Sequence, residues 1–173
     1  ENLSSNKDNF YATTCCTEGL FLAAELFNFQ PEDEIIVPTI SFIAAGSAVV
    51  DSGAKLVLCD VDKRSLNATV KTISEKITRN TKAIILNHYG GHPCDMDDIL
   101  NLARKNNLYI IEDSACAVQS FYKGKACGTM GDMGLWSFDA MKSIVTGDGG
   151  MVYLRSNILM EKAKEQCYLG LPE

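Results

Sequence analysis

The chain has 173 residues, of which 46% are hydrophobic and 22% charged, so its length and composition are those of about one globular domain with a sizeable core. Its formal charge is −6, and it contains no run rich in Lys or Arg, which disfavours nucleic acids and anionic membranes as partners. Seven cysteines without CxxC spacing, no signal pattern and no long apolar run predict a soluble, cytoplasmic protein.

Apolar spacing and turn residues predict an alternation of strands and helices. In chain order they predict a helix at 17–29, a strand at 35–37, a helix at 42–50, strands at 55–59 and 83–86, a helix at 96–105 with Asp95 as its N-cap, strands at 109–111, 134–138 and 151–154, and a helix at 158–168. This alternation predicts a three-layer α/β/α domain with a mostly parallel mixed sheet, in which ligands bind at the carboxyl ends of the strands.

The two ends of the sequence predict that it is part of a longer chain. Glu1 stands in place of an initiator Met, and the sequence stops at Glu173 directly after a helical pattern.

An acid closes the apolar run Leu108-Tyr-Ile-Ile-Glu-Asp113, which places Asp113 at the rim where a ligand of such a sheet binds. Asp is also a favoured helix N-cap, so position alone leaves capping and ligand contact evenly matched.

Lys142 ends the segment Trp136-Ser-Phe-Asp-Ala-Met-Lys142, which leads from an apolar strand into the glycine-rich Thr146-Gly-Asp-Gly-Gly150. Glycines let a backbone approach a ligand closely. Taken alone, Lys142 is more simply interpreted as a solvated loop lysine, since most lysines are exposed.

A small polar cluster, Thr13-Thr-Cys-Cys-Thr17, opens the first predicted helix. Free amides at a helix N-terminus, with hydroxyl groups beside them, form an anion site of the kind that binds phosphate. Simple capping by Thr17 is the ordinary alternative.

Together these three features supply what pyridoxal phosphate (PLP) requires of a protein. They are a lysine for the Schiff base, an acid for the pyridine nitrogen and an anchor for the phosphate.

The order of these features resembles that of the DegT/StrS sugar aminotransferases, which are PLP-dependent enzymes of fold type I. The match runs from about Thr13 to Leu154 and includes Pro31-Glu-Asp-Glu-Ile-Ile-Val-Pro38, Thr39-Ile-Ser-Phe42, Gly53-Ala-Lys-Leu-Val-Leu-Cys-Asp-Val-Asp62, Asn87-His-Tyr-Gly-Gly-His-Pro93, Ile111-Glu-Asp-Ser-Ala115, Gly131-Asp132 and Ser137-Phe-Asp-Ala-Met-Lys142.

The resemblance implies two catalytic residues. Lys142 matches the lysine that forms the Schiff base with PLP and, once freed, shuttles a proton. Asp113 matches the carboxylate that keeps the pyridine nitrogen protonated.

The resemblance also implies further cofactor contacts. Thr17 and Glu18 match residues whose backbone amides hold the phosphate, and Ser137 matches one that adds its hydroxyl. Phe42 matches an aromatic residue that stacks on the pyridine ring, with core packing as the alternative.

Two positions depart from the family's pattern. Cys116 stands where the family often has Gln or His as a second ring contact. At the phosphate turn, Cys15-Cys16-Thr17 replaces the usual Ser-Gly-Thr, which puts a bulkier side chain in place of a glycine.

His88 and His92 do not predict a metal site, because the intervening Tyr-Gly-Gly disfavours a helical pair and no third ligand lies nearby. His88 is expected to be a structural or substrate-side residue.

The resemblance implies transfer of an amino group from an amino acid, usually glutamate, to a nucleotide-linked keto-sugar, in the biosynthesis of cell-surface polysaccharide such as lipopolysaccharide or of secondary metabolites. It places residues 1–173 in the PLP-binding large domain, with an N-terminal arm and a C-terminal small domain outside this sequence. It also implies a homodimer with shared active sites.

Two other functions remain open. One is a PLP-dependent sugar dehydratase of the same family, although those members carry His at the position of Lys142. The other is a non-catalytic or regulatory member of the family, for which Cys116 and the short length argue.

Overall fold

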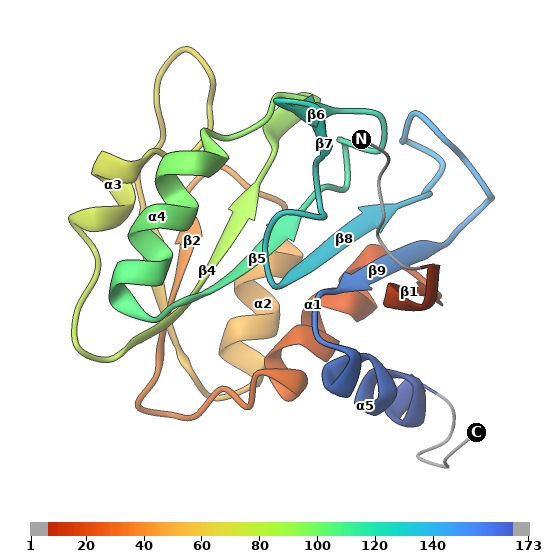
Figure 1. The fold of residues 1–173 in the computed structure, drawn as a ribbon, viewed down its shortest axis with the longest axis horizontal. Coiled ribbons are helices and arrows are strands. Elements are labelled where there is room, and N and C mark those ends of the chain that lie inside the picture. Colours follow the sequence, from red (N-terminus) through yellow and green to blue (C-terminus); the bar gives the residue numbers. More distant parts are fainter. Residues whose placement is uncertain (1–6, 168–173) are drawn as a thin grey trace.

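One mixed sheet organises the chain in the computed structural model, which describes residues 7–167 (Figure 1). Its strands are β1 (Phe10–Thr13), β2 (Glu34–Pro38), β3 (Lys55–Cys59), β4 (Thr81–Asn87), β5 (Tyr109–Asp113), β8 (Met133–Ser137) and β9 (Gly150–Leu154). Their order across the sheet is β1-β9-β8-β5-β4-β2-β3. Only β9 runs against its neighbours, so the prediction of a mostly parallel mixed sheet is confirmed.

Helices cover both faces of the sheet (Figure 1). They are α1 (Cys16–Leu26), α2 (Ile43–Asp51), α3 (Val70–Ser74), α4 (Met96–Asn106) and α5 (Asn157–Cys167), with 3-10 turns at Lys7–Asn9 and Tyr89–Gly91 and a small hairpin of β6 (Phe121–Tyr122) and β7 (Lys125–Ala126). One core cluster joins α1, α2 and α5 to the sheet, and a second joins α3 and α4 to its other face. The three-layer α/β/α prediction is therefore confirmed.

Side chains of β5 alternate between these two cores. Ile111 belongs to the α1/α2 cluster, whereas Ile110 belongs to the α3/α4 cluster. Because the strand period is two residues, the alternation sends Asp113 toward α1 and α2 and Glu112 toward α4. Two adjacent carboxylates thus enter different environments.

Several element boundaries differ from the sequence prediction. The first helix begins at Cys16 and ends at Leu26, because Asn28 takes a left-handed backbone conformation with φ 51°. Asp95 does occupy the N-cap position of α4, but its side chain makes no capping hydrogen bond. The last predicted helix begins at Asn157, and its predicted final residue lies outside the described part.

The sequence prediction lacked β1 and α3, as well as the β6–β7 hairpin and both 3-10 turns. Strand β1 pairs antiparallel with β9, with Thr13 opposite Gly150. Helix α3 is only five residues long and is held by a capping box between Thr69 and Thr72.

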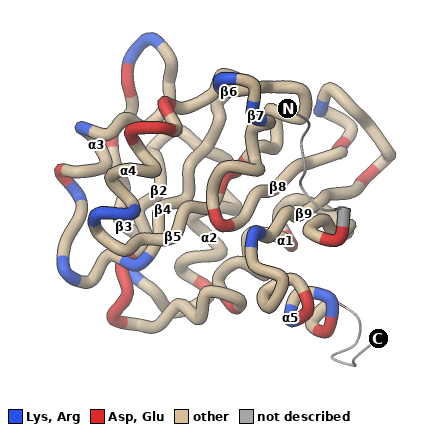
Figure 2. Tube along the Cα trace, viewed as in Figure 1, with Lys and Arg blue, Asp and Glu red and all other residues tan. Residues whose placement is uncertain are grey.

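Charged residues are scattered over loops and helices, with Lys and Arg interspersed among Asp and Glu (Figure 2). No helix within residues 7–167 has the length and apolar character needed to cross a membrane.

Candidate active site

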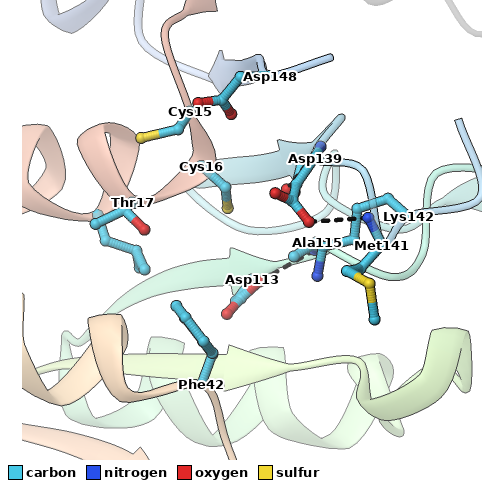
Figure 3. A pocket seen from close by; sticks show the side chains of 12 residues that line it. Cys15, Cys16, Thr17, Phe42, Asp113, Ala115, Asp139, Met141, Lys142 and Asp148 are labelled. Carbon is cyan, nitrogen blue, oxygen red and sulfur yellow. Dashed lines mark hydrogen bonds between the residues drawn. The ribbon is translucent and has the colours of Figure 1, made fainter. Parts of the chain in front are cut away.

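A cavity of about 380 Å³ opens at the carboxyl ends of β5 and β8, between the N-terminus of α1 and the start of α2 (Figure 3). Its volume is in the range of small-molecule and cofactor sites. The cavity brings together five of the seven residues for which a cofactor contact was predicted: Thr17, Phe42, Asp113, Ser137 and Lys142. The side chains of Glu18 and Cys116 lie outside its lining, although each adjoins it.

Asp113 is the carboxylate at the end of β5, and only 3% of it is exposed. One of its oxygens accepts a hydrogen bond of 3.0 Å from the backbone N–H of Ala115. No described residue donates to the other oxygen. Burial raises the pKa of Asp113, and the Ala115 N–H and the charge of Lys142 oppose that rise. A cationic N–H group bound in the cavity would therefore stabilise the charged form of this carboxylate.

The capping interpretation of Asp113 is wrong, because no helix begins there. Residues 114–120 form consecutive turns, and the bond to Ala115 closes a local side-chain turn of the kind that Asp favours.

Lys142 lies in the loop that follows β8 and is half-buried at the cavity (Figure 3). Its backbone N–H donates to the carbonyl of Asp139 at 2.9 Å, which fixes a turn. Its ammonium group lies 3.6 Å from the Cys116 sulfur, and no carboxylate within residues 7–167 pairs with it. The side chain therefore reaches the cavity with an amine that no described carboxylate neutralises.

The N-terminus of α1 forms one wall of the cavity. Cys15, rather than Thr17, is its N-cap, and the Cys15 sulfur accepts a weak hydrogen bond of 3.4 Å from the Glu18 N–H. The Glu18 carboxylate turns back to accept from both the backbone and the hydroxyl of Thr14, at 2.7 and 2.6 Å. No described residue accepts from the Thr17 N–H, so this amide is available to an anion.

This turn rests directly on the backbone of β9. A Cβ atom on Gly150 would lie 2.5 Å from the carbonyl carbon of Cys15 and 2.6 Å from the Thr13 hydroxyl, so only glycine allows the close approach. Cys16 points inward and is 8% exposed, and burial raises the pKa of its thiol. The thiol accordingly stays protonated and acts as a small apolar group.

Ser137 and Phe42 complete the set. Ser137 ends β8, is 8% exposed and lines the cavity, with its hydroxyl 3.4 Å from the Asp139 N–H. Phe42 precedes α2 and is 66% exposed at the cavity, so core packing does not account for it. Figure 3 shows Phe42, Asp113, Thr17 and Lys142 placed around one central space.

His88 is fully buried and bonded to Glu112, with 2.9 Å between the imidazole Nε2 and the carboxylate. Within residues 7–167 no three metal-ligating side chains form a cluster. Glu112 itself was missed as a functional candidate, because the sequence presents it only as a second acid beside Asp113.

The residues present fit PLP. The cavity holds a lysine, a carboxylate oxygen without a partner, an available helix-terminal amide with the Ser137 hydroxyl for a phosphate, and an exposed aromatic ring.

Comparison with known proteins agrees with this geometry. The chain is 48% identical over 157 residues to a dTDP-4-dehydro-2,3,6-trideoxy-D-glucose 4-aminotransferase of Saccharopolyspora spinosa, covering 91% of this chain and 41% of that protein. It superposes on the aminotransferase TlmJ from Streptoalloteichus hindustanus with a TM-score of 0.94 and 48% identity, covering 96% of this chain and 45% of the other. It also superposes on the PLP form of a putative sugar aminotransferase from Streptococcus pneumoniae, with a TM-score of 0.82 and 26% identity, covering 90% and 43%.

The chain thus spans less than half the length of these relatives. The model of the DegT/DnrJ/EryC1/StrS aminotransferase family matches residues 5–173, so this chain belongs to that family.

Proposed function

We propose that this chain forms the PLP-binding large domain, residues 1–173, of an aminotransferase that transfers an amino group from an amino acid, glutamate, to a nucleotide-linked keto-sugar. One observation carries the proposal: Lys142 and the partly unpaired carboxylate of Asp113 line the same cavity as the N-terminus of α1. The similarity to an aminotransferase of a dTDP-linked keto-sugar supports the substrate class.

PLP, the cofactor of this family, supplies an electron sink when bound. Asp113 holds the proton on the pyridine nitrogen, and its burial strengthens that charged hydrogen bond because water competes little for it. The amine of Lys142 would act as the acid–base group: it would take a proton from the amine-bearing carbon of the substrate and give it back later in the same reaction.

The amide of Thr17 and the hydroxyl of Ser137 bind the phosphate, and the positive end of the α1 dipole favours its charge. The Glu18 amide joins them if the phosphate replaces the weak Cys15 sulfur as its acceptor. Phe42 stacks on the ring, a contact that contributes about 1 kcal/mol beyond burial. Cys116 occupies the second ring-contact position.

We also propose a cytoplasmic homodimer with shared sites, acting in cell-surface polysaccharide or secondary-metabolite biosynthesis. Several apolar side chains at or near the cavity support a partner surface there: Phe42 is 66% exposed, Met141 90% and Val145 52%. An apolar patch of this kind is typical of an interface. We further propose that the protein has an N-terminal arm and a C-terminal small domain, since this chain covers 41% and 45% of two relatives.

A sugar dehydratase is disfavoured, because those members of the family carry His at the position of Lys142. A non-catalytic role rests on Cys116 and the short length. The 3.6 Å contact between the Cys116 sulfur and Lys142 leaves the amine at the cavity, which disfavours that role.

The decisive experiment uses the whole protein loaded with PLP. Borohydride reduction followed by peptide mass spectrometry is expected to find the pyridoxyl group on Lys142, and excess glutamate is expected to convert the cofactor to its amine form. Lys142→Arg is the control, because Arg keeps the charge without forming a Schiff base. An adduct on another residue contradicts the role of Lys142, and a cofactor unchanged by glutamate contradicts transamination.

A further inference from the structure

Glu112 is a buried carboxylate that the proposed chemistry does not use. Its side chain is fully excluded from solvent on the face of β5 opposite to Asp113. A carboxylate in such a place is costly unless hydrogen bonds satisfy it. Glu112 therefore requires hydrogen-bond donors, and the segments that supply them are the ones that it holds together.

Four N–H groups donate to Glu112. One oxygen accepts from His88 Nε2 at 2.9 Å and from the Gly128 amide at 2.8 Å. The other accepts from the amides of Met130 and Gly131, at 2.6 and 2.5 Å. The turn at residues 128–131 thus wraps around the carboxylate and forms a nest of backbone N–H groups.

This turn leads directly into β8, the strand that ends at Ser137 and continues to Lys142. The turn packs closely against its neighbours: a Cβ on Gly128 would lie 2.3 Å from the Trp136 ring, and a Cβ on Gly131 would lie 2.6 Å from the Ile110 carbonyl oxygen. The position of this turn relative to β5 depends on the hydrogen bonds between the two segments. Three of these bonds are donated to the Glu112 carboxylate.

His88 directly follows β4 and bonds to Glu112, so it links a third strand to β5 and to the turn that precedes β8. Its Nδ1 accepts from the Cys94 amide at 3.1 Å, so the ring proton is on Nε2 and is donated to Glu112. The backbone N–H of His88 donates to the carbonyl of Asp113 at 3.1 Å. His88 therefore bonds to the Glu112 carboxylate through its ring and to the backbone carbonyl of Asp113 through its own backbone N–H.

We propose that Glu112, oriented by the Nε2–H of His88, is a positioning residue for the cofactor site. It fixes the end of β5, which carries Asp113, relative to the strand that leads to Ser137 and Lys142. Neither Glu112 nor His88 lines the cavity. The role rests on the proposed function, because the site that is positioned is the PLP site.

Two variants of His88 separate positioning from ordinary stability. His88→Gln places an amide N–H where Nε2 lies and so keeps the donor to Glu112, but it loses the acceptor for Cys94. His88→Asn keeps an acceptor near the Nδ1 position and is too short to reach Glu112. Each variant leaves one buried partner unsatisfied, so both are expected to lower the Tm of the cofactor-free whole protein by similar amounts.

The affinity for PLP, measured by visible absorbance during titration of the cofactor-free whole protein, is expected to differ between them. His88→Gln should bind within about threefold of the wild type, and His88→Asn about tenfold or more weakly, as for other residues that orient a site indirectly. Equal affinities of the two variants, or wild-type affinity in His88→Asn, would overturn the positioning role alone. A wild-type protein that takes up no PLP would overturn the proposed function and this role with it.

A measurement on the wild type covers the case in which the variants do not fold. Hydrogen exchange at the amides of Gly128, Met130 and Gly131 is expected to slow when PLP binds, although none of them lines the cavity. Unchanged exchange at all three amides would overturn the proposal.

Discussion

The ammonium group of Lys142 lies 3.6 Å from the sulfur of Cys116 beside the cavity, and Cys116 is the one exposed thiol among the chain's seven cysteines, all of which are described. A thiol that is accessible to solvent is also accessible to electrophilic reagents, whereas a buried thiol is shielded from them. Its exposure distinguishes Cys116 from the other cysteines.

Iodoacetamide is expected to alkylate Cys116 first. Burial raises the pKa of Cys59 to about 11 and those of Cys94 and Cys127 to about 12, so these three remain protonated at pH 8 and are also shielded from reagent. Peptide mass spectrometry over a time course gives the order of labelling. Early labelling of any of the three buried thiols would contradict the structure.

The modified Cys116 is also expected to lower PLP uptake, because the added group occupies space next to Lys142. Cys116→Ser is the matched control, since it keeps a small polar side chain and does not react. Equal PLP uptake before and after labelling would show that the sulfur points away from the bound cofactor.

Asp113→Asn is expected to raise the stability of the cofactor-free protein while removing most of its turnover. Because burial raises the pKa of Asp113 above its unfolded value of 3.8, the folded state binds the proton more tightly. The free energy of unfolding of the wild type therefore falls as the pH rises from the unfolded pKa of Asp113 to its folded pKa. Above the folded pKa, the cost of burying the charged carboxylate is fully present. Asn has no charge to bury and still accepts from the Ala115 N–H.

Thermal unfolding between pH 4 and 8 measures this effect. The Tm of Asp113→Asn should exceed that of the wild type at neutral pH, and the difference should narrow toward pH 4. Turnover of the loaded whole protein should fall on the order of a hundredfold or more, because a neutral amide cannot hold the pyridinium proton. A variant less stable than the wild type at pH 7 would contradict the buried charge.

Gly134→Ala is expected to destabilise the protein by on the order of 3 kcal/mol, because the new Cβ would lie 1.7 Å from the carbonyl oxygen of Gly128. Gly124→Ala is the control, since its φ of +80° strains Ala but nothing lies within 4 Å of the Cβ, and it should cost about 1 kcal/mol. Urea unfolding gives both values. Equal costs would mean that the turn at 128–131 yields easily.

Cys15→Ser is expected to stabilise the protein by about 0.5 to 1 kcal/mol, because Ser is a strong helix N-cap and sulfur a weak acceptor. The hydroxyl would accept from the Glu18 amide in place of the present 3.4 Å contact. Cys15→Ala removes the acceptor and should lower stability. The two variants should therefore shift the urea midpoint in opposite directions, and a shift of the same sign would contradict the capping role.

Most of the fold follows from local patterns in the sequence. The strands β2 and β3 are short apolar runs bounded by Pro and Gly, and β-α-β alternation then places Asp113 at the rim of the sheet. Strand β1 escaped prediction because its residues are mostly half-buried and it is defined by pairing with β9, which no local pattern encodes. Helix α3 is too short to show a helical period.

In the candidate site too, some residues could be predicted from the sequence, whereas others depend on contacts between distant segments. Lys142, Asp113 and Thr17 were singled out from the sequence pattern, and Phe42 and Ser137 were added by the family resemblance. The structure places all five around one cavity. The cap at Cys15 was missed, because a thiol is an uncommon capping group. Glu112 was missed because its role depends on four donors from two distant segments.

The antiparallel pairing of β1 with β9 joins two strands that are far apart in the sequence. The turn that ends at Cys15 rests on Gly150. Because β1 and β9 are roughly 140 residues apart, β1 leaves the ribosome roughly 7 to 28 seconds before its partner at ordinary rates of translation. During this interval Asp113 and then Lys142 emerge, but the turn at Cys15, which begins the proposed phosphate site, does not yet have Gly150 to pack against. A nascent chain arrested before Gly150 should therefore not retain PLP, so we expect PLP to bind only late in the synthesis of this domain.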